Sequence, residues 1–161
     1  MEELLFAIII KMSLILGKSI ISKKLDILPP LLVLEKIKIE KVDKIAKGFQ
    51  FINKDDWFFK CHLPSKPVMP AVLIIEGMLQ TLALLIYETI DHKFEKAFII
   101  DIKSKLLSSI TDVDSEIIYN AKLTSHKRGI SKGIVEVFSD NRKKAVGEFI
   151  YASPHLMTTP R

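Results

Sequence analysis

The sequence predicts an α+β fold in which an antiparallel β-sheet wraps around one long central apolar helix. Two observations predict it. Residues 71–90 are apolar on nearly every side and follow a proline suited to the first turn of a helix. Strand-like segments precede this helix, and a run of further strands follows it. Because a helix without a polar face must be buried on all sides, a sheet curled around it is the economical arrangement.

Six segments are predicted as strands because they are apolar or alternating and several are bounded by turn residues. Turn residues such as Ser139-Asp-Asn-Arg separate several of them. The predicted strands are Leu31–Lys38, Val42–Asn53, Lys96–Ile102, Glu116–Ser125, Gly129–Ser139 and Lys144–Ala152.

The first 26 residues are predicted to be an extension before the domain, which spans residues 27–153 and is followed by a tail at 154–161. Glu2 and Glu3 precede the first apolar run, which disfavours a signal peptide, and the run is too short to span a membrane. Two readings stay open: an amphipathic helix packed on the domain, or a true start at Met12.

The net charge of +5 comes almost entirely from lysine, which disfavours a nucleic-acid reader because such proteins rely on arginine. The positive surface favours an acidic protein partner. Cys61 is the only cysteine, so no intramolecular disulfide forms and a cytoplasmic setting is expected. Glu76, Gln80 and Glu88 within the apolar helix argue against a membrane span.

The segment around residues 57–78 carries the candidate chemistry. His62 is predicted at a strand end, before a helix-free proline loop at 64–70, and histidine is the natural base near neutral pH. Glu76 lies in the apolar helix, where burial would raise the pKa of its carboxyl group and suit it to act as an acid. The free amides of Ala71 and Val72 at the helix start suit a developing oxyanion.

The same residues also allow a purely structural interpretation. A lone histidine near a core is more often a hydrogen-bonded structural residue, and a buried Glu76 could pair with a lysine or a backbone amide. Residue types alone leave both interpretations open. His92, His126 and His155 have no supporting pattern and are predicted at the surface, and no metal-ligand cluster is evident.

A resemblance to a known family favours the catalytic interpretation. The segment is similar to the signature of bacterial 3-hydroxyacyl-acyl-carrier-protein dehydratases, with the fourteen-residue step from His62 to Glu76 preserved. Glutamate at position 76 points to the FabZ type, and Gln80 falls where the family often has glutamine. The matching residues are Phe58-Phe59, His62, Pro64, Pro67-Val-Met-Pro70, Val72-Leu-Ile-Ile-Glu76 and Met78.

The resemblance implies a hot-dog fold and a homodimer, often assembled into a trimer of dimers, that is, a homohexamer. It implies that His62 of one subunit removes the Cα proton of a 3-hydroxyacyl thioester and that Glu76 of the other protonates the leaving hydroxyl. It also implies that the substrate arrives on the phosphopantetheine of an acyl carrier protein, without metal or organic cofactor. The residues that it implies bind substrate are Phe59, Met69, Ala71, Val72 and Gln80.

The chain departs from the family pattern at several positions. Cys61 and Ala71 replace glycines, and Leu63 replaces phenylalanine. Cys61 is predicted to be a small buried thiol that does not pair with His62. The family's Arg- and Pro-containing stretch is replaced around Ser108-Ser109. These losses suggest a divergent relative with altered carrier docking or tunnel length.

Two alternative functions stay open. A hot-dog thioesterase would hydrolyse the thioester, usually with an acidic residue that activates water. A non-catalytic acyl-binding homologue would keep the fold without turnover. Retention of both His62 and Glu76 at the dehydratase spacing disfavours both alternatives.

Overall fold

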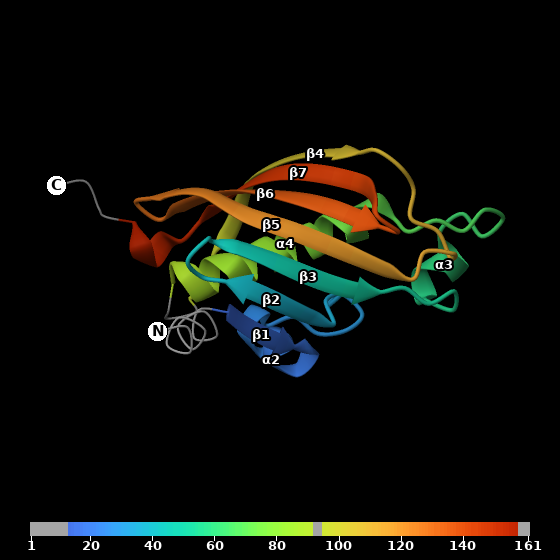
Figure 1. Ribbon diagram of the computed structural model, residues 1–161, viewed down its shortest axis with the longest axis horizontal. Coiled ribbons are helices and arrows are strands. Elements are labelled where there is room, and N and C mark those ends of the chain that lie inside the picture. Colours follow the sequence, from blue (N-terminus) through green and yellow to red (C-terminus); the bar gives the residue numbers. More distant parts are fainter. Residues whose placement is uncertain (1–12, 92–94, 158–161) are drawn as a thin grey trace, which may run out of the picture.

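The computed structural model describes residues 13–91 and 95–157. Within them, seven strands form one sheet in the order β1-β2-β3-β5-β6-β7-β4, with every neighbouring pair antiparallel. The elements are β1 (Ser13–Gly17), α2 (Lys18–Leu25), β2 (Lys36–Glu40), β3 (Ile45–Phe51), α3 (Trp57–Cys61), α4 (Ala71–Thr89), β4 (Phe98–Leu106), β5 (Glu116–Lys127), β6 (Ile130–Ser139), β7 (Arg142–Ala152) and a 3₁₀ turn at Pro154–Leu156. Helix α4 crosses behind the curved sheet (Figure 1), so the predicted fold class is confirmed.

Helix α4 supplies the centre of the core. Met78, Leu82 and Leu85 have no exposed surface and belong to the cluster that the sheet encloses. The helix approaches the sheet so closely at Gly77 that an added Cβ would lie 2.2 Å from Cζ of Tyr119. The helix is long and apolar enough to cross a membrane, but 72% of the relevant 18-residue window is buried inside this fold. Its apolar character therefore has a sufficient explanation in the core.

The predicted strands are confirmed with shifted ends, except at the first one. Strand β2 begins only at Lys36, so the prediction of a strand from Leu31 was wrong for its first five residues. Leu32, Val33 and Leu34 are buried there, as the pattern indicated. The Val33 amide, however, donates to Oε1 of Gln80 on α4 instead of to a neighbouring strand.

The N-terminal segment contains more structure than the sequence indicated. The part of the extension that the structure describes contains helix α2 and, before it, strand β1, which was not predicted; β1 pairs with β2 from Ser13 opposite Glu40 to Gly17 opposite Lys36. The Glu88 carboxylate of α4 fastens this segment, with Lys24 2.7 Å from one oxygen and Lys41 3.2 Å from the other. Residues 1–12 lie outside the described residues, as does the choice of Met12 as the start.

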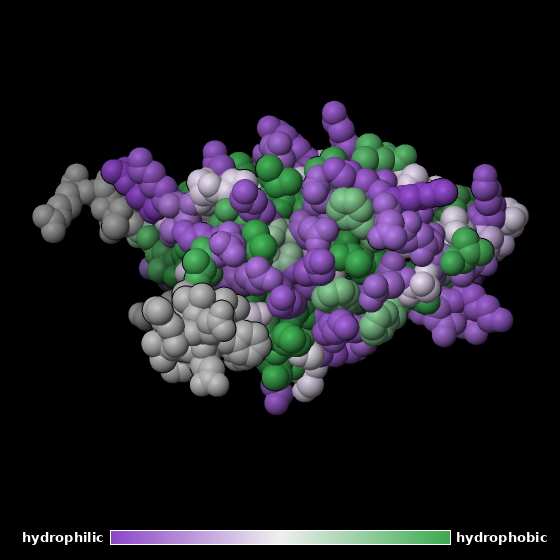
Figure 2. All heavy atoms as spheres, in the orientation of Figure 1, coloured by the Kyte–Doolittle hydropathy of each residue, from purple (hydrophilic) through white to green (hydrophobic). Residues whose placement is uncertain are grey.

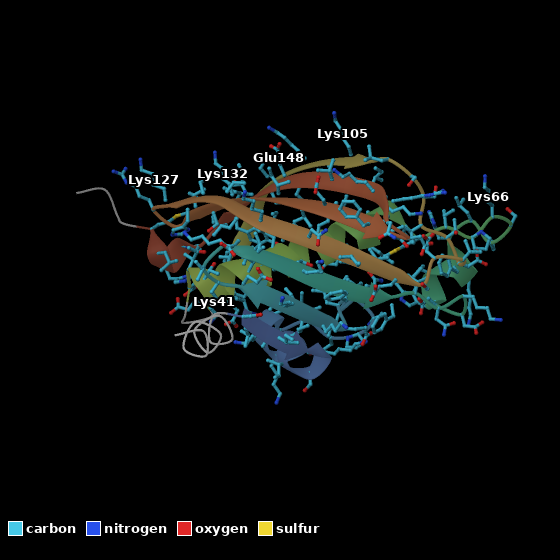
Figure 3. All side chains as sticks on the ribbon, viewed as in Figure 1. Lys41, Lys66, Lys105, Lys127, Lys132 and Glu148 are labelled. Carbon is cyan, nitrogen blue, oxygen red and sulfur yellow. The ribbon has the colours of Figure 1, made fainter. Side chains whose placement is uncertain are left out.

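Hydrophilic and hydrophobic side chains are interspersed across the outer face of the sheet (Figure 2). Several lysines project from separate elements of the fold (Figure 3). Lys105, Lys127 and Lys132 point away from the sheet into solvent, and Lys66 stands on a loop beyond α3 (Figure 3).

Candidate active site

His62 lies at the end of the short helix α3, and its backbone amide donates to the Phe58 carbonyl at 2.9 Å. The prediction of a strand end here was wrong. Phe58 and Phe59 are adjacent yet both are almost fully buried, with ring centroids 4.6 Å apart. Neighbouring residues of a strand point to opposite faces, so a helical turn is the way to bury both. The aromatic pair therefore fixes the position of His62.

The loop after His62 sets the tautomer of its ring. Nδ1 lies 2.9 Å from the Val68 carbonyl oxygen, which can only accept, so Nδ1 carries the hydrogen in this contact. The neutral ring then has its lone pair on Nε2, as a general base requires. The Met69 amide donates to the Ile110 carbonyl at 2.8 Å, which anchors the loop to the segment before β5. The predicted helix-free proline loop is confirmed.

Glu76 lies on α4, on a side of the helix that the sheet leaves open. The expectation of full burial was wrong, since Glu76 is only partly buried and Val72, one turn earlier, is 70% exposed. Gln80 is buried and donates through Nε2 to Oε1 of Glu76 at 2.9 Å and to the Leu31 carbonyl at 2.8 Å. The carboxylate of Glu76 is therefore held in one orientation by a side chain that is itself fixed.

Helix α4 starts at Ala71, directly after Pro70, and its first amides have no partner within the helix. Ala71 is not among the residues with positive φ, so the replacement of glycine does not strain the backbone. Ala71 is partly exposed. These features leave the amide donors available to an oxygen that gains charge.

The remaining predicted site residues differ in their exposure. Phe59 and Met69 are each 4% exposed and form part of the core beneath the His62 loop. The prediction that Cys61 is buried was wrong: it is exposed at the end of α3, where its thiol donates to the Phe58 carbonyl at 3.6 Å. Cys61 lies in the last turn of a short helix, on the side away from the core, which a strand pattern could not indicate.

A hollow of about 250 Å³ lies beside Glu76 on the open side of α4. Its walls come from α4, from the N-terminal segment and from strands β4 and β7. They are Leu25, Ile27, Glu76, Leu79, Gln80, Ala83, Tyr87, Ala97, Phe98, Ile99 and Tyr151. Burial, and then the charge of Glu76, raise the pKa of Tyr151 far above its usual range, so its hydroxyl stays protonated and donates to the Leu79 carbonyl. Apart from Glu76, the walls are uncharged.

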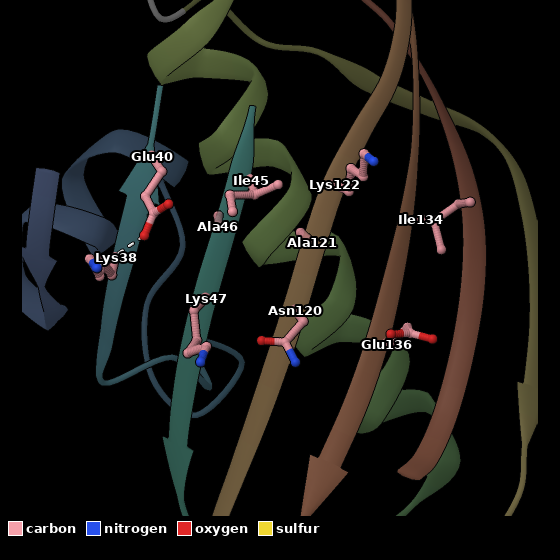
Figure 4. A pocket seen from close by; sticks show the side chains of 10 residues that line it. All are labelled: Lys38, Glu40, Ile45, Ala46, Lys47, Asn120, Ala121, Lys122, Ile134 and Glu136. Atoms are coloured by element: carbon pink, nitrogen blue, oxygen red, sulfur yellow. Dashed lines mark ion pairs between the residues drawn. The ribbon is translucent and has the colours of Figure 1, made fainter. Parts of the chain in front are cut away.

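A larger hollow of about 470 Å³ lies on the opposite, outer face of the sheet (Figure 4). Its charged residues largely neutralise one another, as where Lys38 lies 3.0 Å from Glu40. It contains none of the predicted site residues. Size alone therefore does not identify the site, and the chemistry favours the smaller hollow.

The other histidines that the structure describes do not form a second site. His126 bonds Ser131, and His155 pairs with the buried Asp91, so the prediction that His155 is a surface residue was wrong. His92 lies outside the described residues. In residues 13–91 and 95–157, no three His, Cys, Asp or Glu side chains form a group that could hold a metal ion.

Comparison with known proteins identifies the family. A family model described as a FabA-like domain matches residues 28–147, and the chain belongs to this family. The chain is 31% identical to the 3-hydroxyacyl-[acyl-carrier-protein] dehydratase FabZ of Fusobacterium nucleatum over 76% of this chain and 86% of that protein. It is 30% identical to the FabZ of Caldicellulosiruptor bescii over 82% of this chain and 96% of that protein.

Solved structures share the fold at low sequence identity. The conserved protein PA5202 of Pseudomonas aeruginosa aligns with a TM-score of 0.56 and 17% identity, covering 68% of this chain and 81% of its own. A putative thioesterase, a phenylacetic acid degradation-related protein from Ralstonia eutropha, aligns with a TM-score of 0.59 and 11% identity, covering 70% and 78%. Both likenesses establish the hot-dog fold, and neither decides the activity.

Proposed function

We propose that the protein is a 3-hydroxyacyl-acyl-carrier-protein dehydratase. The observation that carries the proposal is that two side chains at the family spacing, His62 and Glu76, are each oriented by a hydrogen bond. His62 has its Nδ1 hydrogen bound to the Val68 carbonyl, and Glu76 is bound by Gln80. One group is set up to take a proton through Nε2, and the other to give one from a fixed carboxyl.

The proposed reaction is a β-elimination. Nε2 of His62 removes the Cα proton of the 3-hydroxyacyl thioester while the amide at Ala71 stabilises the thioester oxygen as it gains charge. The carboxyl group of Glu76 gives a proton to the leaving hydroxyl, directly or through a water. A carbon–carbon double bond forms and the carbon–oxygen bond breaks, giving a trans-2-enoyl thioester and water. The proton on His62 then returns to Glu76 for the next turnover.

A homodimer completes the proposed site, with His62 from one subunit and Glu76 from the other. Strand β4 is one of the two edge strands of the sheet, and it is exposed along almost its whole length, including Phe98 and Ile100. Val72 is exposed on the open side of α4. An exposed apolar edge beside an exposed apolar helix stripe is a surface that a second copy would cover.

The proposed partner is an acidic carrier protein. Lys60 and Lys66 flank His62 and are exposed, and Lys66 projects from the loop in Figure 3. Positive charge beside the entrance would steer an acidic domain toward the site and orient its phosphopantetheine arm.

The test is an absorbance and mass assay with crotonyl- and longer enoyl-carrier-protein thioesters, beside a His62→Ala control. We expect reversible addition of water that the control loses by about 10²–10⁴-fold. Release of free acid and thiol would instead make the protein a thioesterase. A folded dimer without any reaction would identify a non-catalytic acyl-binding homologue.

A further inference from the structure

The loop after His62 carries backbone strain next to the proposed base. Leu63 has a φ of 50°, in the left-handed region that a residue with a side chain adopts only at a cost. Its side chain is 56% exposed, so its own packing contributes little to offset that cost. Strain of this kind persists only where surrounding contacts impose it. The contacts that fix this loop are therefore expected beyond Leu63 itself.

The end of the loop is bound to the connection between β4 and β5, which runs beside α3 (Figure 1). Val68 forms an isolated antiparallel bridge with Thr111. One residue later, the Met69 amide donates to the Ile110 carbonyl at 2.8 Å. The Val68 carbonyl also accepts the hydrogen on Nδ1 of His62. The β4–β5 connection thus fixes the residue that orients the imidazole ring.

The buried carboxylate of Asp114 shapes this connection. Its Oδ2 accepts from the Thr111 amide at 2.8 Å and from the Thr111 hydroxyl at 3.3 Å. The Asp114 amide in turn donates to the Thr111 carbonyl at 3.1 Å, so the two residues close a tight turn. Asp114 is only 4% exposed, and a carboxylate so far removed from water needs a partner of opposite charge.

Lys144 of strand β7 supplies that charge. Its ammonium group lies 3.0 Å from Oδ1 of Asp114 and donates to the Ser109 carbonyl at the same distance. The Lys144 carbonyl accepts from the Leu107 amide at 2.8 Å and from the Ser108 amide at 3.2 Å. Lys144 therefore binds the β4–β5 connection at both of its ends, at residues 107–109 and at Asp114.

These contacts form one path from β7 to the proposed base. Lys144 binds Asp114, and Asp114 binds Thr111. Thr111 is bridged to Val68, whose carbonyl accepts from His62. We propose that Lys144 and Asp114 are positioning residues, which hold His62 in the tautomer that leaves Nε2 free to act as the base. The proposal rests on the proposed function and adds to it two residues that act through the loop instead of on the substrate.

The first experiment reads the tautomer of His62 without turnover. Long-range ¹H–¹⁵N spectra, recorded where the ring is neutral, distinguish a hydrogen on Nδ1 from one on Nε2. His62→Gln assigns the signal among the four histidines. We expect the Nδ1–H tautomer in the unaltered protein and a mixture of both in Lys144→Met. A folded Lys144→Met protein that keeps the pure Nδ1–H tautomer would overturn the proposal.

The second experiment separates kcat from KM in the dehydratase assay. Lys144→Met should lower kcat about 10–100-fold with little change in KM, because a displaced base acts poorly in the transition state. Lys144→Arg keeps the charge and should retain most of kcat. Lys143→Met is the matched control, since Lys143 is the preceding residue of β7, is 41% exposed and pairs with Glu136 instead. A raised KM with unchanged kcat in Lys144→Met would contradict a positioning role.

Two further variants separate positioning from a general loss of stability. Met78→Ala weakens the core outside this path, so a mixed His62 tautomer there too would overturn the specific role of Lys144. If Lys144→Met does not fold, Asp114→Asn removes the same ion pair with little change of shape, and the same mixture of tautomers is expected. No dehydratase turnover by the unaltered protein would overturn the proposed function, whereas the tautomer would still decide whether the path positions His62.

Discussion

The two sides of helix α4 have very different surroundings. On one side, Met78, Leu82 and Leu85 are enclosed by the sheet and have no exposed surface. On the other side, Val72 is 70% exposed and Glu76 is partly exposed beside a hollow. The enclosed side accounts for the fold. The open side combines an unpartnered apolar surface with a fixed carboxylate, and it is there that we place the second subunit and the reaction.

The largest expected effect comes from disrupting the proposed subunit interface on the open side of α4. Ile100→Lys on the free edge of β4 should turn the dimer into a folded monomer and reduce dehydratase activity to background, because each site would lose one member of its pair. Val42→Lys is the matched control, since Val42 is 58% exposed and Ile100 57%. Light scattering and the enoyl assay provide the two readouts. An active Ile100→Lys monomer would contradict the shared site.

A substitution on the enclosed side of α4 should lower the free energy of unfolding. Met78→Ala removes a side chain with no exposed surface and is expected to cost about 2–5 kcal/mol in the free energy of unfolding. Val113→Ala, at a residue that is 83% exposed, should change that free energy by less than about 0.5 kcal/mol. Urea denaturation checks both. Similar losses for the two variants would mean that the burial of Met78 contributes little to the stability of the fold.

A smaller effect is expected at Asp114, in the segment where the chain departs from its family. Burial alone would raise the pKa of Asp114, but hydrogen bonds, led by the one from the Thr111 amide, and the charge of Lys144 together lower it below its ordinary 3.8. Lys144 lies 3.0 Å from its carboxylate.

Because the folded-state pKa is lowered, the stabilisation by Asp114 is present above pH 3.8 and is lost as the pH falls through the folded value. Asp114→Asn should therefore cost about 1–3 kcal/mol at neutral pH. The difference from the unaltered protein should shrink below about pH 4. Denaturation curves at several pH values measure it, and a difference that is independent of pH would exclude the charge as its cause.

The smallest expected effect lies at the border of the two sides. Tyr151→Phe removes the hydroxyl that donates to the Leu79 carbonyl at 2.9 Å and should cost about 0.5–1.5 kcal/mol. The ring would still line the hollow beside Glu76, so dehydratase activity should not change. A loss of activity would show that the hydroxyl also supports the site.

The sequence predicted the elements whose side-chain pattern is regular. The unbroken apolar run at 71–90 predicted α4, and alternation predicted β3, β5, β6 and β7. It missed β1 and misplaced the start of β2. At β2, tertiary contact decided the outcome, since Val33 bonds Gln80 from α4 and not a neighbouring strand.

The candidate site likewise separates what the residue pattern predicts from what tertiary contacts decide. The types and spacing of His62 and Glu76 were evident from the sequence, and so was the proline loop between them. The sequence could not show that His62 ends a helical turn, because the joint burial of Phe58 and Phe59 decides that. Nor could it show the contacts of His62 with Val68 and of Glu76 with Gln80, which depend on the folded chain.

Subunit complementation tests the central claim most directly. Purified His62→Ala and Glu76→Gln proteins should each be inactive, and mixing them under conditions that exchange subunits should restore activity. In a heterodimer, one of the two sites keeps both side chains, so random exchange predicts about a quarter of the original activity. That recovery is the result we predict. Inactivity of the mixture despite proven heterodimers, or substantial activity of either variant alone, would contradict a site built from His62 of one subunit and Glu76 of the other.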